Sequence, residues 1–175
     1  MTDRTVLVTD YTWSSTDPEA AVLAEVGAEL LIAREGTEEE LLSLVRHADA
    51  ILTCFAQVPA SVIRAGEKLQ VVGRYGIGVD NIAVAEATRL GIPVTNVPVY
   101  CLDEVAEHAL AMLLVLARKI NVYDRAVHQD SNWALQSGMP MYRIRGAHAG
   151  HSGLRQDRTD ARAEGARLGS ARDHP

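Results

Sequence analysis

Short apolar runs alternate with more polar, helix-like segments over the first part of the chain. The runs are rich in Val, Ile and Leu, as expected for strands that are buried on both faces of a sheet. They lie at residues 5–9, 29–33, 49–53, 69–72 and 92–96. This alternation predicts an α/β fold with a parallel sheet, because each strand must return to the same edge through a helix.

Helix start and stop signals fill the gaps between these runs. Asp17 and Pro18 predict an N-cap and a first helical turn, and Gly27 ends that helix. Thr37 and Glu40 have the spacing of a capping box, for a helix that runs to residue 47. Further helices are expected at residues 59–66 and 81–90. The strand order that fits this arrangement is 2-1-3-4-5, as in flavodoxin-like folds.

One long helix is predicted after the fifth strand, at residues 102–128. Its first turn carries Asp103 and Glu104, whose charges the helix dipole favours. A wide apolar face follows; it consists of Ala106, Ala109, Leu110, Leu113, Leu114, Ala117 and Ile120. We therefore divide the chain into a flavodoxin-like domain at residues 1–100 and a linking helix, with the start of a further domain, at residues 101–146.

Composition excludes several functional classes. The net charge is −6 and the hydrophobic fraction is 47%, which argues against a nucleic-acid-binding surface and is typical of globular proteins. The longest apolar stretch, at residues 109–117, is far shorter than a membrane span. No signal-peptide pattern opens the chain, and Cys54 and Cys101 do not make a disulfide framework. A cytoplasmic protein without a nucleic-acid or membrane partner is expected.

A glycine-rich loop follows the strand at residues 69–72. It contains Gly73, Gly76 and Gly78, and it lies at the carboxyl end of a strand, where open α/β sheets bind ligands. Since Gly76 and Gly78 have no Cβ atoms, backbone N–H groups can approach a small anion there. The loop is either an anion-binding loop or an ordinary turn between a strand and a helix, and its spacing alone does not choose between them.

Three sequence runs in this region occur together in one known family. They are GRYGIGVDNI at residues 73–82, GIPVTNVP at 91–98 and DEVAEHALAMLL at 103–114. With these runs the chain resembles, over residues 6–146, the D-isomer-specific 2-hydroxyacid dehydrogenases, which include phosphoglycerate dehydrogenases, glyoxylate reductases and the C-terminal-binding-protein corepressors. The resemblance implies an NAD-dependent oxidoreductase that acts on the CH–OH group of a D-2-hydroxy acid, and a homodimer in the intact family.

The resemblance assigns a substrate site to this chain. The backbone N–H groups of Ile77 and Gly78, next to Gly76, are expected to hold the carboxylate of a small 2-hydroxy or 2-oxo acid. The segment with Cys54 and Phe55, after the third strand, is expected to line the substrate cleft. Phosphoglycerate-specific members carry an arginine near Cys54. Its absence here favours a smaller or more apolar acid, or a corepressor-like relative.

The family's cofactor and catalytic groups are largely missing from the sequence. Tyr100 and Cys101 are expected on the nicotinamide side of the NAD site, with core packing as the alternative. The family's catalytic arginine, glutamate and histidine have no counterpart, so neither a catalytic residue nor a metal ligand is predicted. His108, four residues after Glu104, is interpreted as a helix-surface or interdomain residue. We expect the chain by itself to be inactive; a non-catalytic corepressor-like or flavodoxin-like binding module is the alternative.

The composition changes at Ala147. The remaining residues, 147–175, contain no Val, Ile, Met, Phe, Trp or Tyr, so they bury too little apolar surface to fold. One compatible set of synonymous codons, with a single base inserted in the codon of Ala147, restores a frame that reads G-F-G-K-I-G after an apolar strand. That pattern is typical of a dinucleotide-binding turn. We expect a truncated chain with an out-of-frame, disordered tail at residues 147–175; a genuine arginine-rich tail is the alternative.

Overall fold

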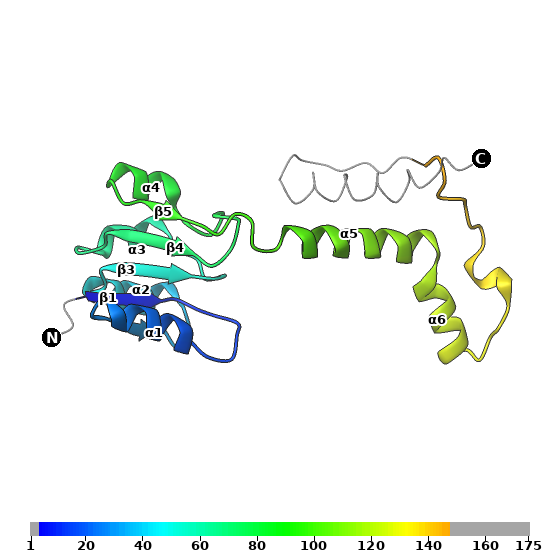
Figure 1. The fold of residues 1–175 in the computed structure, drawn as a ribbon, viewed down its shortest axis with the longest axis horizontal. Helices are drawn as coiled ribbons and strands as arrows, with labels where there is room; N and C mark the ends of the chain where they lie inside the picture. The colour runs from blue at the N-terminus through cyan, green and yellow to red at the C-terminus, as the bar shows by residue number, and fades with distance from the viewer. Residues whose placement is uncertain (1–3, 148–175) are drawn as a thin grey trace. The chain divides into compact units, whose positions relative to one another are not determined.

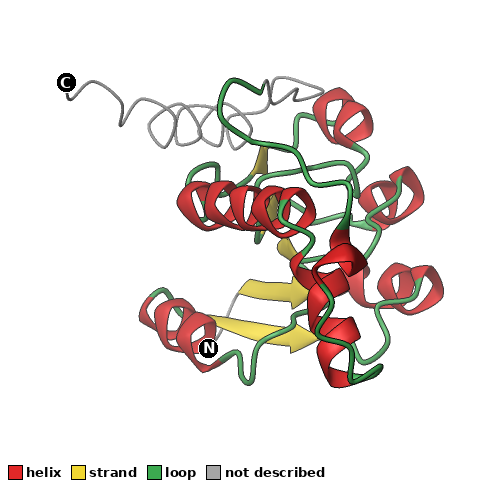
Figure 2. Cartoon of the chain, turned by 90° about the vertical axis from the view of Figure 1, so that its right-hand side faces the viewer, coloured by secondary structure: helices red, strands yellow, loops and turns green. Residues whose placement is uncertain are grey.

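A five-stranded sheet is the centre of the first half of the computed structural model, which describes residues 4–147. Its strands are β1 (Arg4–Val8), β2 (Ala28–Ile32), β3 (Ala50–Thr53), β4 (Val71–Arg74) and β5 (Val94–Thr95). They are ordered β2-β1-β3-β4-β5, as labelled in Figure 1, and every neighbouring pair is parallel. The strand arrows that are clearly visible in Figure 2 point the same way. The sequence prediction of a flavodoxin-like α/β fold with this strand order is confirmed.

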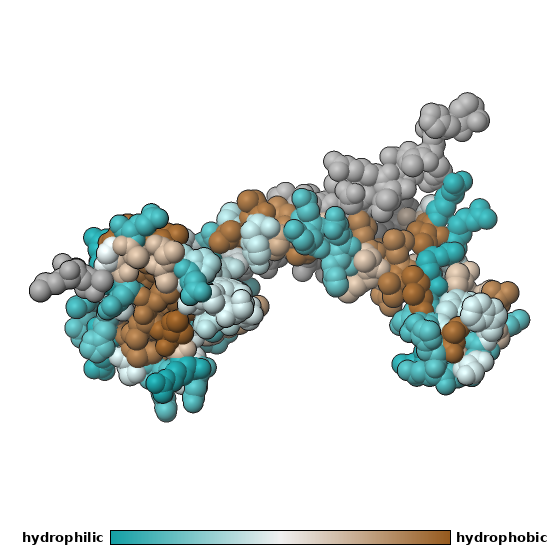
Figure 3. All heavy atoms as spheres, turned by 60° about the horizontal axis from the view of Figure 1, so that its bottom comes forward, coloured by the Kyte–Doolittle hydropathy of each residue, from teal (hydrophilic) through white to brown (hydrophobic). Residues whose placement is uncertain are grey.

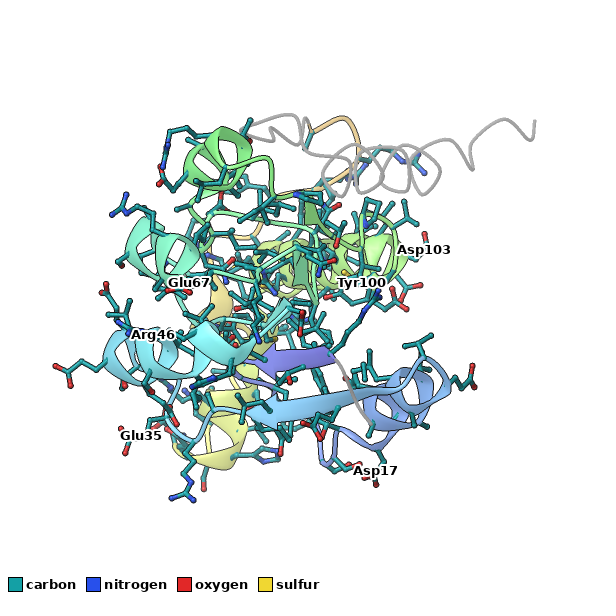
Figure 4. The ribbon with its side chains drawn as sticks, turned by 90° about the vertical axis from the view of Figure 1, so that its left-hand side faces the viewer. Asp17, Glu35, Arg46, Glu67, Tyr100 and Asp103 are labelled. Atoms are coloured by element: carbon teal, nitrogen blue, oxygen red, sulfur yellow. The ribbon has the colours of Figure 1, made fainter. Side chains whose placement is uncertain are left out.

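Four helices connect the strands. They are α1 (Asp17–Glu25), α2 (Glu38–Leu44) with a 3₁₀ turn η1 (Val45–His47), α3 (Ala60–Ala65) and α4 (Val84–Arg89). Figure 4 shows α1 on one side of the sheet and α2, α3 and α4 on the other. This is the distribution that right-handed crossovers require when the chain moves outward to β2 and then back across β1.

The core lies between the sheet and the helices α2, α3 and α4. Leu7, Ile51 and Val72 project from the three central strands into it and are fully buried. The helices contribute apolar side chains; these include Leu41, Val45, Val62, Ile63 and Ala87. Burial of each large aliphatic side chain contributes about 1.5–3 kcal/mol to stability. This packing holds the carboxyl ends of β1, β3 and β4 in fixed positions.

The helix starts differ in detail from the sequence prediction. The residue before α1 is Thr16, and Asp17 lies inside the helix, so the prediction of Asp17 as the N-cap is wrong. For α2, the Glu40 N–H donates to Thr37 Oγ1 at 3.4 Å, as expected for a capping box. The Glu40 carboxylate does not complete the box. It accepts hydrogen bonds from the backbone N–H groups of Arg34, Glu35 and Gly36, which precede the helix.

Strand β4 lies two residues later than predicted. The apolar run favours residues 69–72, whereas the strand covers Val71–Arg74. Leu69 instead belongs to a turn, in which its N–H donates to the Gly66 carbonyl at 3.1 Å. Pairing decides the boundary, because β3 aligns Ala50 with Val71 and Thr53 with Arg74. Arg74 is therefore the last residue of a central strand.

The chain divides into two units, Met1–Tyr100 and Cys101–Pro175. The second unit contains α5 (Leu102–Ala117), α6 (Ile120–His128) and a 3₁₀ turn η2 (Leu135–Gly138). The prediction of one helix over residues 102–128 is wrong, because the helix breaks at Lys119, where φ is +57°.

A hydrogen bond between α6 and η2 fixes the chain after the break, at which no glycine or proline lies. The Tyr123 hydroxyl donates to the Leu135 carbonyl at 2.7 Å, so η2 folds back on α6. Gly138 makes this contact possible, since a Cβ there would lie 2.5 Å from the Tyr123 ring. Tyr123 and Gly138 thus hold η2 against α6.

Apolar side chains remain on the surface of α5. Ala106 is its only buried residue among those described, while Met112 and Leu116 are 51% and 65% exposed. Figure 3 shows apolar residues on the surface of each unit, between hydrophilic ones. Within residues 4–147, no helix has the length and hydropathy that a membrane span needs. Except for Ala147, the predicted out-of-frame tail at residues 147–175 lies outside the described residues.

Candidate functional site

Three strand ends meet at one edge of the sheet. Asp10 follows β1, Cys54 and Phe55 follow β3, and the glycine-rich loop follows β4. The Tyr75 N–H donates to the Thr53 carbonyl at 2.9 Å, which extends the pairing of β3 and β4 up to this edge. The carboxyl edge of a parallel sheet is where ligands bind in this class of fold. The structure therefore brings the predicted substrate residues of β3 and β4 to neighbouring strand ends.

The loop after β4 is held through its carbonyl groups. The Val97 N–H donates to the Gly76 carbonyl at 3.1 Å, and the Asn96 amide donates to the Ile77 carbonyl at 2.8 Å. In contrast, the N–H groups of Gly76, Ile77 and Gly78 donate to no acceptor within residues 4–147. Backbone N–H groups of a folded protein normally have a hydrogen-bond partner, so these three donors can take one from a ligand or from water. The loop is thus fixed while its donors stay available.

Asp10 organises the neighbouring loop, and the sequence analysis did not assign it a role here. Its carboxylate accepts the N–H groups of Cys54 at 2.9 Å and Phe55 at 2.6 Å, and the Thr9 hydroxyl at 2.8 Å. Burial raises the pKa of Asp10, but these hydrogen bonds outweigh it, so the pKa lies below its usual value. Asp10 is therefore an ionised carboxylate that fixes the backbone of the loop after β3.

Cys54 and Phe55 form contrasting parts of this loop. Cys54 is buried, and burial, followed by the charge of Asp10, raises the pKa of its thiol. A neutral thiol is a poor nucleophile, so Cys54 acts as an apolar wall residue. Phe55 is 67% exposed, and its ring centre lies 5.6 Å from Cζ of Arg74. An exposed aromatic ring beside a guanidinium is a stable arrangement.

Arg74 and Asn81 connect the two loops. Arg74 Nε donates to Asn81 Oδ1 at 3.1 Å, and Asn81 Nδ2 donates to the Ala56 carbonyl at 2.8 Å. Gly76 leaves room for this arrangement, since a Cβ on Gly76 would lie 3.2 Å from Nη1 of Arg74. The sequence places Arg74 next to the loop, but it does not reveal that this side chain folds back over Gly76.

Tyr75 supports the loop from the side of β1. Its ring packs edge-on against Trp13, with centroids 4.7 Å apart. Its hydroxyl and Glu19 Oε2 are both buried without a hydrogen-bond partner in the described part of the chain. Burial, followed by the charge of Glu19, raises the pKa of Tyr75. Tyr75 is therefore a neutral packing residue.

The two residues expected at the cofactor lie where the units join. Tyr100, labelled in Figure 4, is 59% exposed and is the last residue of the first unit. Cys101 is the residue before α5, and its side chain makes no capping hydrogen bond to that helix. Their assignment to the nicotinamide side stays a prediction.

A model of the D-isomer specific 2-hydroxyacid dehydrogenase catalytic domain matches residues 6–168. The chain belongs to this family. The matched range continues beyond Gly146, where the sequence analysis expects the reading frame to change. That expectation stays a prediction.

Relatives within the family carry different substrate names. The D-3-phosphoglycerate dehydrogenase of Archaeoglobus fulgidus is 39% identical over 129 residues, which cover 73% of this chain and 24% of that protein. The glyoxylate reductase of Pyrococcus furiosus is 40% identical over 101 residues, which cover 57% of this chain and 30% of that protein. The chain thus spans less than a third of the length of these two relatives.

Solved structures share the fold. The D-lactate dehydrogenase of Aquifex aeolicus, solved with NAD and lactic acid, has a TM-score of 0.77 and 18% identity. The alignment covers 95% of this chain and 49% of that enzyme. At this identity the likeness concerns the architecture alone, and the chemistry of the present chain must be argued from its own residues.

Proposed function

We propose that residues 1–100 are the substrate domain of an NAD-dependent oxidoreductase acting on the CH–OH group of a D-2-hydroxy acid. The free N–H groups of Ile77 and Gly78 carry this proposal, since they are held ready to bind the carboxylate of a 2-hydroxy or 2-oxo acid. Hydrogen bonds from backbone amides to a carboxylate are charge-assisted and stronger than those between neutral groups. Membership of the dehydrogenase family supports the same substrate class.

The surrounding residues favour a small acid. We assign Phe55 and Cys54, on the loop after β3, as the apolar wall of the site; Phe55 lies against Arg74, whose guanidinium also lies against Gly76. Apolar neighbours reduce the water around a bound carboxylate and strengthen its hydrogen bonds. The role of the chain is to bind and orient the acid. A nicotinamide cofactor supplies or accepts the hydride when it is bound.

The titratable groups at this site do not fit acid–base catalysis. A proton-transfer group works best when its pKa lies near the operating pH. The pKa of Asp10 is lowered, whereas the pKa values of Cys54 and Tyr75 are raised, so none of the three exchanges a proton readily near neutral pH. We therefore propose that the chain by itself binds the acid without oxidising or reducing it.

The described residues also do not fit a dinucleotide at this loop. A pyrophosphate is normally held at the N-terminus of a helix that directly follows the glycine-rich turn. Here α4 begins only at Val84 and is six residues long. Tyr100 and Cys101 stay the proposed neighbours of the cofactor on the nicotinamide side.

An amide-resolved titration tests acid binding. We expect added glyoxylate or pyruvate to shift the ¹H–¹⁵N signals of Ile77 and Gly78 in a saturable way. The Gly91 N–H donates to the Thr88 carbonyl at 3.0 Å outside the site, so its signal is the internal control and should not move. The methyl ester of pyruvate, which lacks the negative charge, is the matched control ligand.

Two results would contradict the proposal. One is the absence of shifts at Ile77 and Gly78 at acid concentrations that saturate typical enzymes, up to about 1 mM or somewhat above. The other is an equal response to the ester, because binding would then not depend on the carboxylate. Turnover of NADH by the chain alone would contradict the second part of the proposal, that it has no catalytic group.

A further inference from the structure

Asn81 joins the two loops of the site at several points. Its Oδ1 accepts Nε of Arg74 at 3.1 Å, and its Nδ2 donates to the Ala56 carbonyl at 2.8 Å. Its backbone carbonyl accepts the Val58 N–H at 2.8 Å. Asn81 follows β4, whereas Ala56 and Val58 follow β3. One residue thus connects the loop with the free amides to the loop with the apolar wall.

Arg74 extends this connection to the ligand-facing surfaces of both loops. Its guanidinium lies 5.6 Å from the centre of the Phe55 ring on one loop. On the other loop it lies against Gly76, where an added Cβ would be 3.2 Å from Nη1. Nε donates to Asn81 while the terminal nitrogens lie against Gly76, an arrangement of several nitrogens that a single ammonium group cannot reproduce.

From these contacts we infer that Asn81 and Arg74 are positioning residues that fix the spacing between the amides of Ile77 and Gly78 and the wall at Phe55. This spacing selects the size of the acid that the site accepts. The inference rests on the proposed function for the identity of the ligand. Its physical reason is preorganisation: a site whose parts are already fixed loses little conformational freedom on binding.

The competing explanation is that Arg74 acts only through its positive charge. The two explanations differ in what Asn81 does. If charge alone matters, Asn81 is dispensable and lysine can replace Arg74. If positioning matters, loss of Asn81 must change the site even though Arg74 keeps its charge.

Three variants of the full chain separate these explanations. Asn81→Ala removes both side-chain hydrogen bonds and keeps the charge of Arg74. Arg74→Lys keeps the charge and removes the planar donor, and it also serves if Asn81→Ala does not fold. Asp80→Ala is the matched control, because the Asp80 side chain is exposed and forms no hydrogen bond or ion pair within residues 4–147.

Two readouts are measured on each variant. Without any acid, ¹H–¹⁵N spectra report whether the signals of residues 76–78 stay sharp and unshifted. With acid, titrations give the ratio of dissociation constants for glyoxylate and the bulkier phenylpyruvate. We expect Asn81→Ala and Arg74→Lys to broaden or shift the loop signals and to weaken glyoxylate binding about tenfold or more. We also expect both to reduce the preference for the smaller acid, whereas Asp80→Ala leaves this preference and the signals of residues 76–78 unchanged.

The outcomes distinguish this inference from the proposed function. Unchanged loop signals and an unchanged acid ratio in Asn81→Ala would overturn the inference while acid binding stands. Normal binding in Arg74→Lys would assign the effect to charge alone. If the unmodified chain binds no acid, the proposed function fails. The acid-free spectra then still decide whether Asn81 and Arg74 position the loop.

Discussion

Removal of the Asp10 carboxylate tests whether the loop after β3 depends on its backbone hydrogen bonds to Asp10. Asp10→Ala deletes two hydrogen bonds to backbone N–H groups, of 2.9 Å to Cys54 and 2.6 Å to Phe55. Hydrogen bonds to a charged group contribute about 1.5–3 kcal/mol each. Water can replace part of this at the exposed Phe55, so we expect a loss of about 3 kcal/mol. For a unit of this size, that corresponds to a fall in Tm of about 10 °C or more.

The effect should also depend on pH, with a sign that follows from the lowered pKa of Asp10. A carboxyl whose pKa is lower in the folded state stabilises the protein above its unfolded pKa of about 3.9. That contribution disappears as the pH falls through the folded pKa. The stability difference between the unmodified chain and Asp10→Ala should thus be constant near neutral pH and shrink below about pH 4.

Thermal unfolding by circular dichroism, together with hydrogen exchange of the β1 and β3 amides, measures this loss. Glu67→Ala is the matched control, since this acidic side chain is exposed and forms no hydrogen bond or ion pair among the described residues; Glu67 is labelled in Figure 4. A Tm for Asp10→Ala within about 2 °C of the control would refute the stabilising role of Asp10. A difference that grows at acidic pH would refute the assigned ionisation state.

Three further changes test other features. Tyr75→Phe removes a buried hydroxyl that has no hydrogen-bond partner among the described residues, so denaturant unfolding should show unchanged or higher stability, by up to about 1 kcal/mol; a clear loss of stability would contradict this expectation. Gly36→Ala places a Cβ 2.8 Å from the Thr9 carbonyl at a φ of +65°, and should cost about 1–3 kcal/mol in the same assay; an unchanged midpoint would contradict this. The chain should self-associate through its exposed apolar residues, and Met112→Glu with Leu116→Glu should increase the monomer fraction in sedimentation experiments. A chain that is already monomeric would contradict this expectation.

The sequence predicts the fold well because the strands are buried. The runs around Leu7, Ile51 and Val72 are apolar on both faces, and this alone indicates a parallel sheet with helices on its sides. The boundaries of the strands are predicted less accurately, because hydrogen-bond pairing with the neighbouring strands sets them. Arg74 looks like a loop residue in the sequence and becomes part of β4 through its register with Thr53.

The site is only partly predictable, because several of its contacts join residues that are distant in the sequence. Gly76 and Gly78 are compatible with an anion loop or with an ordinary turn, and it is the family resemblance that assigns the carboxylate to Ile77 and Gly78. The partners of Asp10 are 44 and 45 residues away, so no local pattern reveals its role. The break at Lys119 is equally hidden, because neither a glycine nor a proline marks it in the sequence.

The edge-on contact between Trp13 and Tyr75 has a practical consequence. Tyr75 directly precedes the three free amides, so a movement of the loop changes the surroundings of the indole ring. The only other tryptophan of the chain, Trp133, is 86% exposed and can be replaced by phenylalanine. The intrinsic fluorescence of Trp13 would then be an optical reporter of ligand entry that requires no attached dye.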